Sequence, residues 1–265
     1  MQPEREHRSA KQLWDLKAQD WHQQVGQDGD ANRRFNSDPV LWRFIGSVQN
    51  LEVLDAGCGT GYLARKLAQK GAKVVAVDFS ERMIKTAREL TATLEIAVDY
   101  RVDSCASLLT LTDESIDLIV SNYVLMDVPQ LELAVASFYR VLRPNGRAAI
   151  VITHPCFPQS DETILTNRVV SEDGSVSYTW KTSYFDETEF IDPPWRHFTT
   201  PFRVYHRPLS QYWKTFQTMG FQVIDFDEPV VPDPPPPEFH PRNLRDYRLR
   251  PDSVAFLLRK HWEIK

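Results

Sequence analysis

The segment Val53–Gly61 decides the fold; it runs Val-Leu-Asp-Ala-Gly-Cys-Gly-Thr-Gly. An apolar run leads into the glycines and a helical pattern over Tyr62–Lys70 follows them, so the glycines lie where a strand turns into a helix. Glycine allows a tight turn and a close approach of ligand to backbone, because it has no Cβ. Ligands of open α/β sheets bind beyond the carboxyl ends of the strands. The segment therefore predicts a ligand-binding loop.

Short apolar runs alternate with helical patterns on both sides of this loop. Runs rich in Val, Ile and Leu are typical of strands buried on both faces of a parallel sheet. The predicted strands are Leu51–Ala56, Lys73–Asp78, Ala97–Val102, Ile116–Asn122 and Ala148–Thr153, and the predicted helices are Tyr62–Lys70, Glu81–Leu90 and Pro129–Leu142. A turn is expected at Arg143–Gly146. This alternation predicts a doubly wound sheet.

The remaining segments predict four parts in the chain. These are an N-terminal helical cap over residues 1–50, a ligand-binding core over 51–153, an inserted part over 154–206, and a C-terminal completion of the sheet over 207–265. The cap contains predicted helices Lys11–Gln24 and Asp38–Val48, and the C-terminal part contains a helix Leu209–Met219 and strands Phe221–Asp227 and Ser253–Arg259. The expected fold class is α/β, with a doubly wound, mostly parallel seven-stranded Rossmann-like sheet.

The inserted part differs from the core in its pattern. It has no clear periodicity and is dense in aromatic residues. Segments of this length without secondary structure are uncommon inside compact domains, and they often serve as binding lids. We expect either a lid or a small strand-rich subdomain after the fifth strand.

The composition narrows the class of protein. The chain has 265 residues, 42% of them hydrophobic, and a net charge of -5, which argues against nucleic acid as the partner. No stretch approaches the roughly 20 apolar residues of a membrane helix, and residues 1–20 lack the apolar core of a signal peptide. Cys58, Cys105 and Cys156 form no CxxC pair, so neither a disulfide framework nor a zinc site is expected. We expect a cytoplasmic protein without a metal site.

The residues around the glycines select the ligand. Asp78 ends the second predicted strand about 20 residues on, where a carboxylate can accept hydrogen bonds from ribose hydroxyls. The spacing Gly-x-Gly-x-Gly differs from the Gly-x-Gly-x-x-Gly of nicotinamide-binding folds. Asp55, two positions before the first glycine, would repel a pyrophosphate and attract an ammonium group. A nucleoside-like, cationic ligand is expected, and S-adenosylmethionine (SAM) has these properties.

Five ordered segments resemble the motif series of class I SAM-dependent methyltransferases, in particular the branch with quinone-biosynthesis and small-molecule enzymes. They are Val53–Gly61, Ala76–Ser80, Val102–Ser104, Ile116–Val120 and Leu142–Gly146. The resemblance is strong over residues 51–153 and weaker over 207–260. It implies a methyltransferase (EC 2.1.1) that uses SAM, releases S-adenosylhomocysteine (SAH), and methylates an oxygen, nitrogen or carbon atom of a small molecule.

The resemblance also implies site residues. Asp55, Gly57 and Gly59 would surround the methionine part of SAM, and Cys58 would belong to this binding loop as a small residue between the glycines. Asp78 would hold the ribose, and Phe79 and Met83 would flank the adenine. Asp103 and Ser104 would lie at the edge of the adenine, and Asn122 would form the floor near the methyl group. Trp21 is expected to close over SAM, and Arg34 or its neighbour Arg33 to pair with the SAM carboxylate. For Met83 the alternative is a core side chain, and for Asp103 an ordinary loop acid.

Three residues are candidates for acid–base or substrate contacts. Asp127 follows the fourth strand, where members of the resembling families often have a histidine; its alternative role is to cap the helix after Pro129. His154 lies just beyond the fifth strand, and its alternative is a structural histidine. His206 ends the inserted part, and its alternative is a surface position.

Other functions remain open at this point. They are methylation of RNA or protein, a non-catalytic SAM-binding regulator, and a nicotinamide oxidoreductase. The sequence does not define the methyl acceptor or the oligomeric state.

Overall fold

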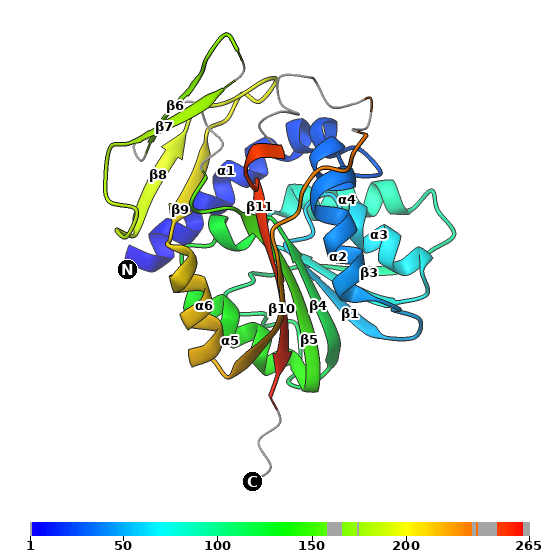
Figure 1. The fold of residues 1–265 in the computed structure, drawn as a ribbon. Coiled ribbons are helices and arrows are strands. Elements are labelled where there is room, and N and C mark those ends of the chain that lie inside the picture. Colours follow the sequence, from blue (N-terminus) through cyan, green and yellow to red (C-terminus); the bar gives the residue numbers. More distant parts are fainter. Residues whose placement is uncertain (1, 158–165, 174, 235–236, 238–247, 262–265) are drawn as a thin grey trace.

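The computed structural model describes residues 2–157, 166–173, 175–234, 237 and 248–261. Its centre is a seven-stranded sheet of order β10-β11-β5-β4-β1-β2-β3 (Figure 1). The strands are β1 (Glu52–Ala56), β2 (Lys73–Asp78), β3 (Val98–Val102), β4 (Ile116–Asn122), β5 (Leu142–Thr153), β10 (Phe221–Asp227) and β11 (Ser253–Lys260). Strand β11 runs antiparallel to both of its neighbours, while β1–β5 pair in parallel. The predicted fold class is confirmed.

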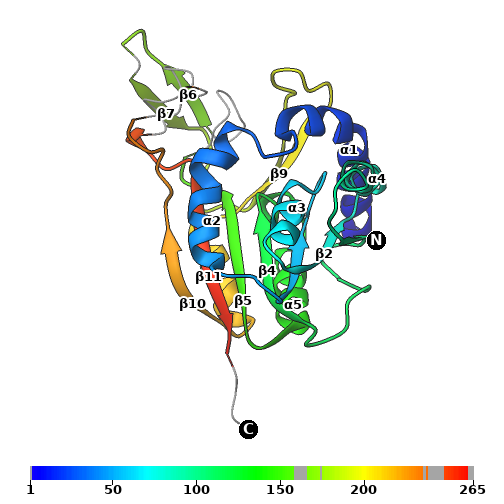
Figure 2. The ribbon, with the colours of Figure 1, turned by 90° about the vertical axis from the view of Figure 1, so that its right-hand side faces the viewer.

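Helices cover both faces of the sheet, because successive strand residues point to opposite sides. Val53 packs in a core with α2 (Asp38–Ile45), α3 (Tyr62–Gln69) and α4 (Glu81–Thr91), whereas Leu54 packs in a second core with α5 (Leu131–Val141) and α6 (Leu209–Thr218). Figure 2 shows α2 and α3 on the face toward the viewer. Among the described residues, no helix is long and apolar enough to cross a membrane.

The first helix extends further than predicted. Helix α1 spans Gln2–Val25 instead of beginning at Lys11. It lies at the end of the sheet where the parallel strands finish, next to α4 (Figures 1 and 2). A short π-helix, Arg33–Ser37, then leads directly into α2. The N-terminal segments therefore lie over the edge at which ligands of such sheets bind.

Strand β5 begins at Leu142, earlier than the predicted strand, but the residues of the turn predicted at Arg143–Gly146 have no registered partner on β4. Leu142 pairs with Ile116, and the next registered pair is Arg147 with Leu118, so the residues between them bulge out of the ladder. Asn145 takes a φ of 64° there. An asparagine tolerates this left-handed conformation, which lets the chain bend without leaving the sheet.

The inserted part contains two hairpins in the residues that the structure describes. Strands β6 (Thr166–Val170) and β7 (Val176–Trp180) form one, and β8 (Thr188–Asp192) and β9 (Phe202–His206) form the other. Of the two predicted alternatives, this arrangement agrees with a strand-rich insertion. Residues 158–165 and 174 lie outside the described residues. Figure 1 shows the hairpins at the same end of the sheet as α1, and β9 contacts that helix.

Candidate functional site

The glycine loop needs its glycines for two reasons. Gly57 has a φ of 78° and Gly59 a φ of 53°, which are left-handed values that residues with a Cβ rarely adopt. A Cβ on Gly57 would also lie 2.5 Å from the Val124 side chain. The amides of Gly57 and Cys58 both donate to the carbonyl of Val77, at 2.9 Å, which anchors the loop to β2. The loop therefore has a fixed shape.

Asp78 connects this loop to the next helix. One of its carboxylate oxygens accepts a hydrogen bond from the Gly59 amide at 3.0 Å, and the other from the Ser80 amide at 2.9 Å. Ser80 in turn caps α4 by accepting from the Met83 amide. Burial raises the pKa of Asp78 to about 6, although both backbone hydrogen bonds lower it. A buried carboxylate thus lies at the carboxyl end of β2, as predicted.

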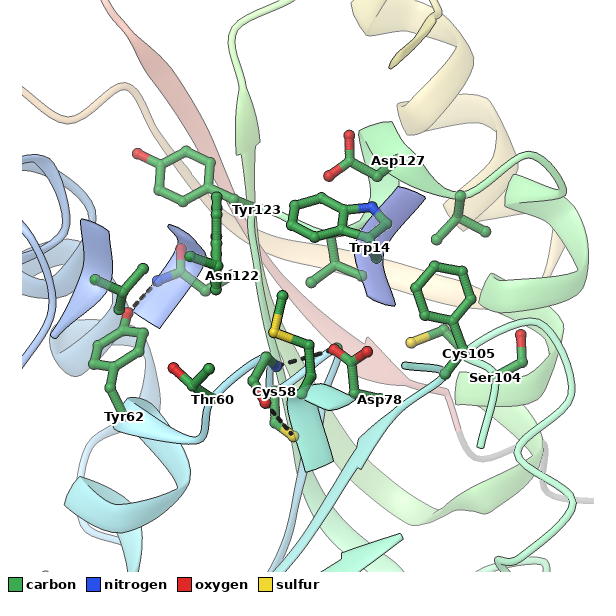
Figure 3. A pocket seen from close by; sticks show the side chains of 18 of the residues that line it. Trp14, Cys58, Thr60, Tyr62, Asp78, Ser104, Cys105, Asn122, Tyr123 and Asp127 are labelled. Atoms are coloured by element: carbon green, nitrogen blue, oxygen red, sulfur yellow. Dashed lines mark hydrogen bonds between the residues drawn. The ribbon is translucent and has the colours of Figure 1, made fainter. Parts of the chain in front are cut away.

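A cavity opens beside the loop, at the carboxyl ends of the parallel strands. Nine predicted cofactor residues line it: Trp21, Gly57, Cys58, Gly59, Asp78, Phe79, Met83, Ser104 and Asn122. Figure 3 shows several of these side chains around the loop. Sequence segments more than 100 residues apart therefore meet in one cavity.

Two predicted cofactor residues lie next to the cavity without lining it. Asp55 is buried beneath the loop, where burial raises its pKa to about 7. Asp103 accepts hydrogen bonds from the amides of Ser104 and Thr110, both at 2.7 Å. Its geometry is that of a loop acid that shapes the segment carrying Ser104, which was the alternative interpretation.

Arg33, not Arg34, lines the cavity. The Arg33 guanidinium is buried, pairs with Asp30 at 2.9 Å, and lies 4.9 Å from the Trp21 ring. The Arg34 guanidinium instead lies over Phe35. The sequence did not separate the two arginines, because they are adjacent and the π-helix decides which of them points inward.

Some lining residues, among them Tyr62 and Thr60, escaped the sequence analysis. The predicted Asn122 donates from its amide to the Tyr62 hydroxyl at 2.7 Å, and Tyr62 donates to Asp38 at 3.0 Å. The Asn122 carbonyl oxygen and the Thr60 hydroxyl are buried and have no hydrogen-bond partner among the described residues. Such atoms are costly unless a ligand or water pairs them. Thr60 was detectable, because it lies inside the glycine motif.

Helix α1 closes one side of the cavity. A Cβ on Gly59 would lie 3.1 Å from the Trp21 ring nitrogen, so this indole lies directly against the loop. The helix is fixed at two points: Asp15 accepts from the Ser80 hydroxyl at 2.7 Å, and Asp20 accepts from the Thr199 amide at 3.1 Å. The N-terminal helix thus bridges the core and the inserted part.

Asp127 is the predicted acid–base candidate that lines the cavity. It lies in a 3₁₀ turn, Leu125–Asp127, just after β4. Burial raises its pKa to about 8, Lys17 opposes that rise, and Asp192 adds to it. The predicted alternative, a helix cap, does not match, because α5 begins at Leu131 and its N-cap position is Gln130.

The two predicted histidines lie away from the cavity wall. His154 Nδ1 accepts from the Cys156 amide at 3.2 Å, so its Nε2 carries the proton and donates to Glu228 at 2.7 Å. His206 Nε2 donates to the carbonyl of Tyr184 at 2.8 Å. Burial lowers the pKa of both rings. These contacts are those of structural histidines, and the structure places neither beside Asp78.

Comparison with known proteins supports one family. Residues 54–150 match the family model described as a methyltransferase domain. A malonyl-[acyl-carrier protein] O-methyltransferase of Pectobacterium atrosepticum is 38% identical over 119 residues, covering 45% of each chain. A ubiquinone biosynthesis O-methyltransferase of Xanthomonas oryzae pv. oryzae is 35% identical over 123 residues, covering 45% of this chain and 52% of the relative. The chain thus spans about half the length of these relatives.

One solved structure resembles this chain over most of its length. The S-adenosylmethionine dependent methyltransferase from Mesorhizobium loti aligns with a TM-score of 0.70 at 21% identity. The alignment covers 88% of this chain and all of that one. At this identity the match shows a shared fold, including parts of the chain outside residues 54–150.

Proposed function

We propose that the chain is a class I SAM-dependent methyltransferase, as the match of residues 54–150 to a methyltransferase domain supports, and that it transfers a methyl group from SAM to a small molecule. The observation that carries the proposal is the cavity at the glycine loop, where Asp78 lies beside the unpaired oxygens of Thr60 and Asn122. Hydroxyl and ammonium groups of a nucleoside-like cation are suitable donors to these oxygens.

The residues present fit SAM on both chemical and steric grounds. In this proposal Asp78 accepts from the ribose hydroxyls, while Phe79 and Met83 flank the adenine. Asn122 and Thr60 pair with the ammonium group, and the Arg33 guanidinium faces the carboxylate. The cavity residues carry the donors and acceptors that these groups need, and Gly57 and Gly59 allow the close approach.

When bound, SAM supplies an electrophilic methyl group, whose departure needs no acid. The chain then contributes mainly position and shielding. The fixed glycine loop orients the donor, and Trp21 and Trp14 exclude water from the methyl group. Aromatic faces near a cationic donor also favour it electrostatically.

A small molecule is the acceptor that best suits the cavity and the net charge of -5. The named relatives act, by their descriptions, on a malonyl-acyl carrier protein and in ubiquinone biosynthesis, so relatives with this domain use different acceptors. A cytoplasmic location is part of the proposal. The alternative of a non-catalytic SAM-binding regulator is excluded once any acceptor yields SAH.

The test is calorimetric titration with SAM, SAH and NAD⁺. We expect SAM and SAH to bind and NAD⁺ to show no binding. Asp78→Ala should abolish binding of both adenosyl ligands, whereas Glu132→Ala, at an exposed position on α5, should leave it unchanged. Circular dichroism would establish that both variants are folded. Binding of NAD⁺ in place of SAM, or of none of the three, would overturn the proposal.

A further inference from the structure

One carboxylate in the cavity has no role in the proposed binding of SAM. Asp127 lines the cavity together with the apolar residues Trp14, Val124, Val128 and Pro129. In Figure 3, Asp127 lies above Asp78, and Trp14 lies between them in the view. Among the described residues, no group hydrogen-bonds the Asp127 carboxylate. The half-buried carboxylate is therefore free to accept a hydrogen bond from a ligand in the cavity.

Lys17 faces Asp127 from helix α1. Its side chain is fully buried, and its ammonium lies 5.1 Å from the Trp14 ring centre and 4.7 Å from the Phe202 ring centre. Its hydrogen bond to the Leu13 carbonyl is long, at 3.5 Å. Burial lowers the pKa of Lys17 to about 8, although Asp127 opposes that change. Burying a lysine ammonium group among aromatic side chains costs free energy, because the group is removed from water. This cost indicates that the charge of Lys17 has a role.

The other charged groups around Asp127 come from the inserted part and the segment before α6. Asp192 on β8 is close enough to raise its pKa. Arg207 donates to the carbonyls of Leu125, Val128 and Pro129, so it holds the backbone on both sides of Asp127. Tyr212 on α6 is buried nearby and senses the charge of Asp127. Lys17 is therefore the cation whose charge acts on this carboxylate.

We propose that the methyl acceptor is a neutral aromatic or heteroaromatic molecule whose O–H or N–H group donates to Asp127, and that Lys17 is a positioning residue for this carboxylate. The proposal rests on the proposed function. In the transfer, the acceptor atom forms a bond to the methyl carbon and the carbon–sulfur bond breaks, with its electron pair left on sulfur. The acceptor's proton passes to Asp127 and then to water.

The charge and shape of the wall support this class of acceptor. An anionic acceptor would place its charge against Asp127, and a cationic one would add a positive charge next to SAM and near Lys17, which lies behind the Trp14 ring. The rings of Trp14 and Trp21 are perpendicular, at 90°, with their centres 5.0 Å apart. The two indoles therefore form a corner in which the edge of one ring meets the face of the other. Flat rings pack well against such a corner. A neutral, flat molecule with an O–H or N–H group packs against the tryptophan rings and also donates a hydrogen bond to the Asp127 carboxylate.

Binding of matched probes to the SAH-loaded protein tests the acceptor class. Catechol and benzimidazole carry the O–H or N–H group, 1,2-dimethoxybenzene and 1-methylbenzimidazole lack it, and benzoate and hexanoate are anionic. We expect catechol or benzimidazole to bind at least tenfold more tightly than its methylated partner and than both anions. Asp127→Leu should remove that preference, while Glu132→Ala should retain it.

The possible failures are distinguishable. If SAH binds but neither neutral probe does, or if an anion binds more tightly, or if Asp127→Leu keeps the preference, the acceptor class is wrong and the proposed function stands. If SAH itself does not bind, the proposed function fails as well.

Carboxyl ¹³C NMR tests the role of Lys17 without any acceptor. The Asp127 signal, identified by its loss in Asp127→Asn, should titrate near pH 8. Lys17→Met should raise this midpoint because a nearby cation is removed, and Asp192→Asn should lower it because an anion is removed. Lys17→Arg should restore the midpoint. An unchanged midpoint in a folded Lys17→Met protein would overturn the positioning role.

Discussion

The two halves of the cavity are built in different ways. The half beside the glycine loop depends on backbone conformation and on residues at strand ends, such as Gly57 and Asp78. The half beside Asp127 depends on side chains from α1, the segment after β4 and the inserted part, which are far apart in the chain. The first half suits a ligand of fixed shape shared by a family. The second half can vary with little cost to the fold, which suits a ligand specific to each enzyme.

The largest effect is expected from Gly57→Ala. The added Cβ would meet Val124 at 2.5 Å and would force an alanine to a φ of 78°. We expect at least a hundredfold loss of SAM affinity, measured by calorimetry, because the loop must move. Val124→Ala should relieve the contact but not the backbone strain, so the double variant should recover binding only in part. Normal affinity in the single variant would mean that the loop is not the binding element.

A pH series tests the electrostatics of the half beside the glycine loop. Burial raises the pKa of Asp55 to about 7 and of Asp78 to about 6. A bound cation favours the ionised carboxylates, so SAM affinity should be highest above pH 7 and should fall as the pH drops through 7 and then 6, by up to about tenfold per unit for each group. Calorimetry between pH 5.5 and 8 measures this fall. Adenosine, which is uncharged, is the control and should respond less; an equal fall for both ligands would contradict the electrostatic assignment.

The paired variants Arg33→Met and Arg34→Met sharpen the description of the cofactor half. Arg33 lines the cavity in an aromatic setting, whereas Arg34 does not line it. We expect about a tenfold loss of SAM affinity for Arg33→Met, in line with the loss of one charge-assisted contact, and no change for Arg34→Met. Thermal unfolding provides the control for Arg33→Met, because Asp30 loses its partner. The opposite order of effects would assign the contact to Arg34.

The smallest functional effect is expected at the two histidines. His154→Ala removes hydrogen bonds to Glu228 and Cys156, and His206→Ala removes one to Tyr184. Each should lower the free energy of unfolding by about 1–2 kcal/mol and leave SAM affinity within twofold. Denaturant titration and calorimetry measure the two quantities. A tenfold loss of turnover at unchanged stability would restore the catalytic role predicted from sequence.

The sequence predicted the first half well because its signals are local. Three of these signals lie within about 20 residues of one another in the chain. They are Gly57 with its positive φ, Asp78 at the end of β2, and Ser80, which caps α4. The strand order also follows from alternating patterns, although the bulge at Asn145 hid the start of β5.

The second half was out of reach because its contacts are tertiary. Lys17 belongs to an ordinary charged helix in sequence, and only the packing of Trp14 and Phe202 shows that it is buried. His154 follows a strand at the correct edge of the sheet, yet its ring turns toward Glu228, on the chain that leaves β10. Position along a strand indicates the edge of the sheet on which a side chain lies, and the neighbours on other segments decide its direction.

Helix α1 contributes to both halves, since Trp21 lies against Gly59 while Lys17 faces Asp127. When one ligand orders helix α1, the helix loses conformational entropy. The second ligand then binds to a helix that is already ordered, so its own binding costs less conformational entropy. The affinities of donor and acceptor are then linked, and each raises the other by the same factor. In the proposed reaction the acceptor would accordingly bind more tightly once SAM is in place, and SAM more tightly once the acceptor is in place.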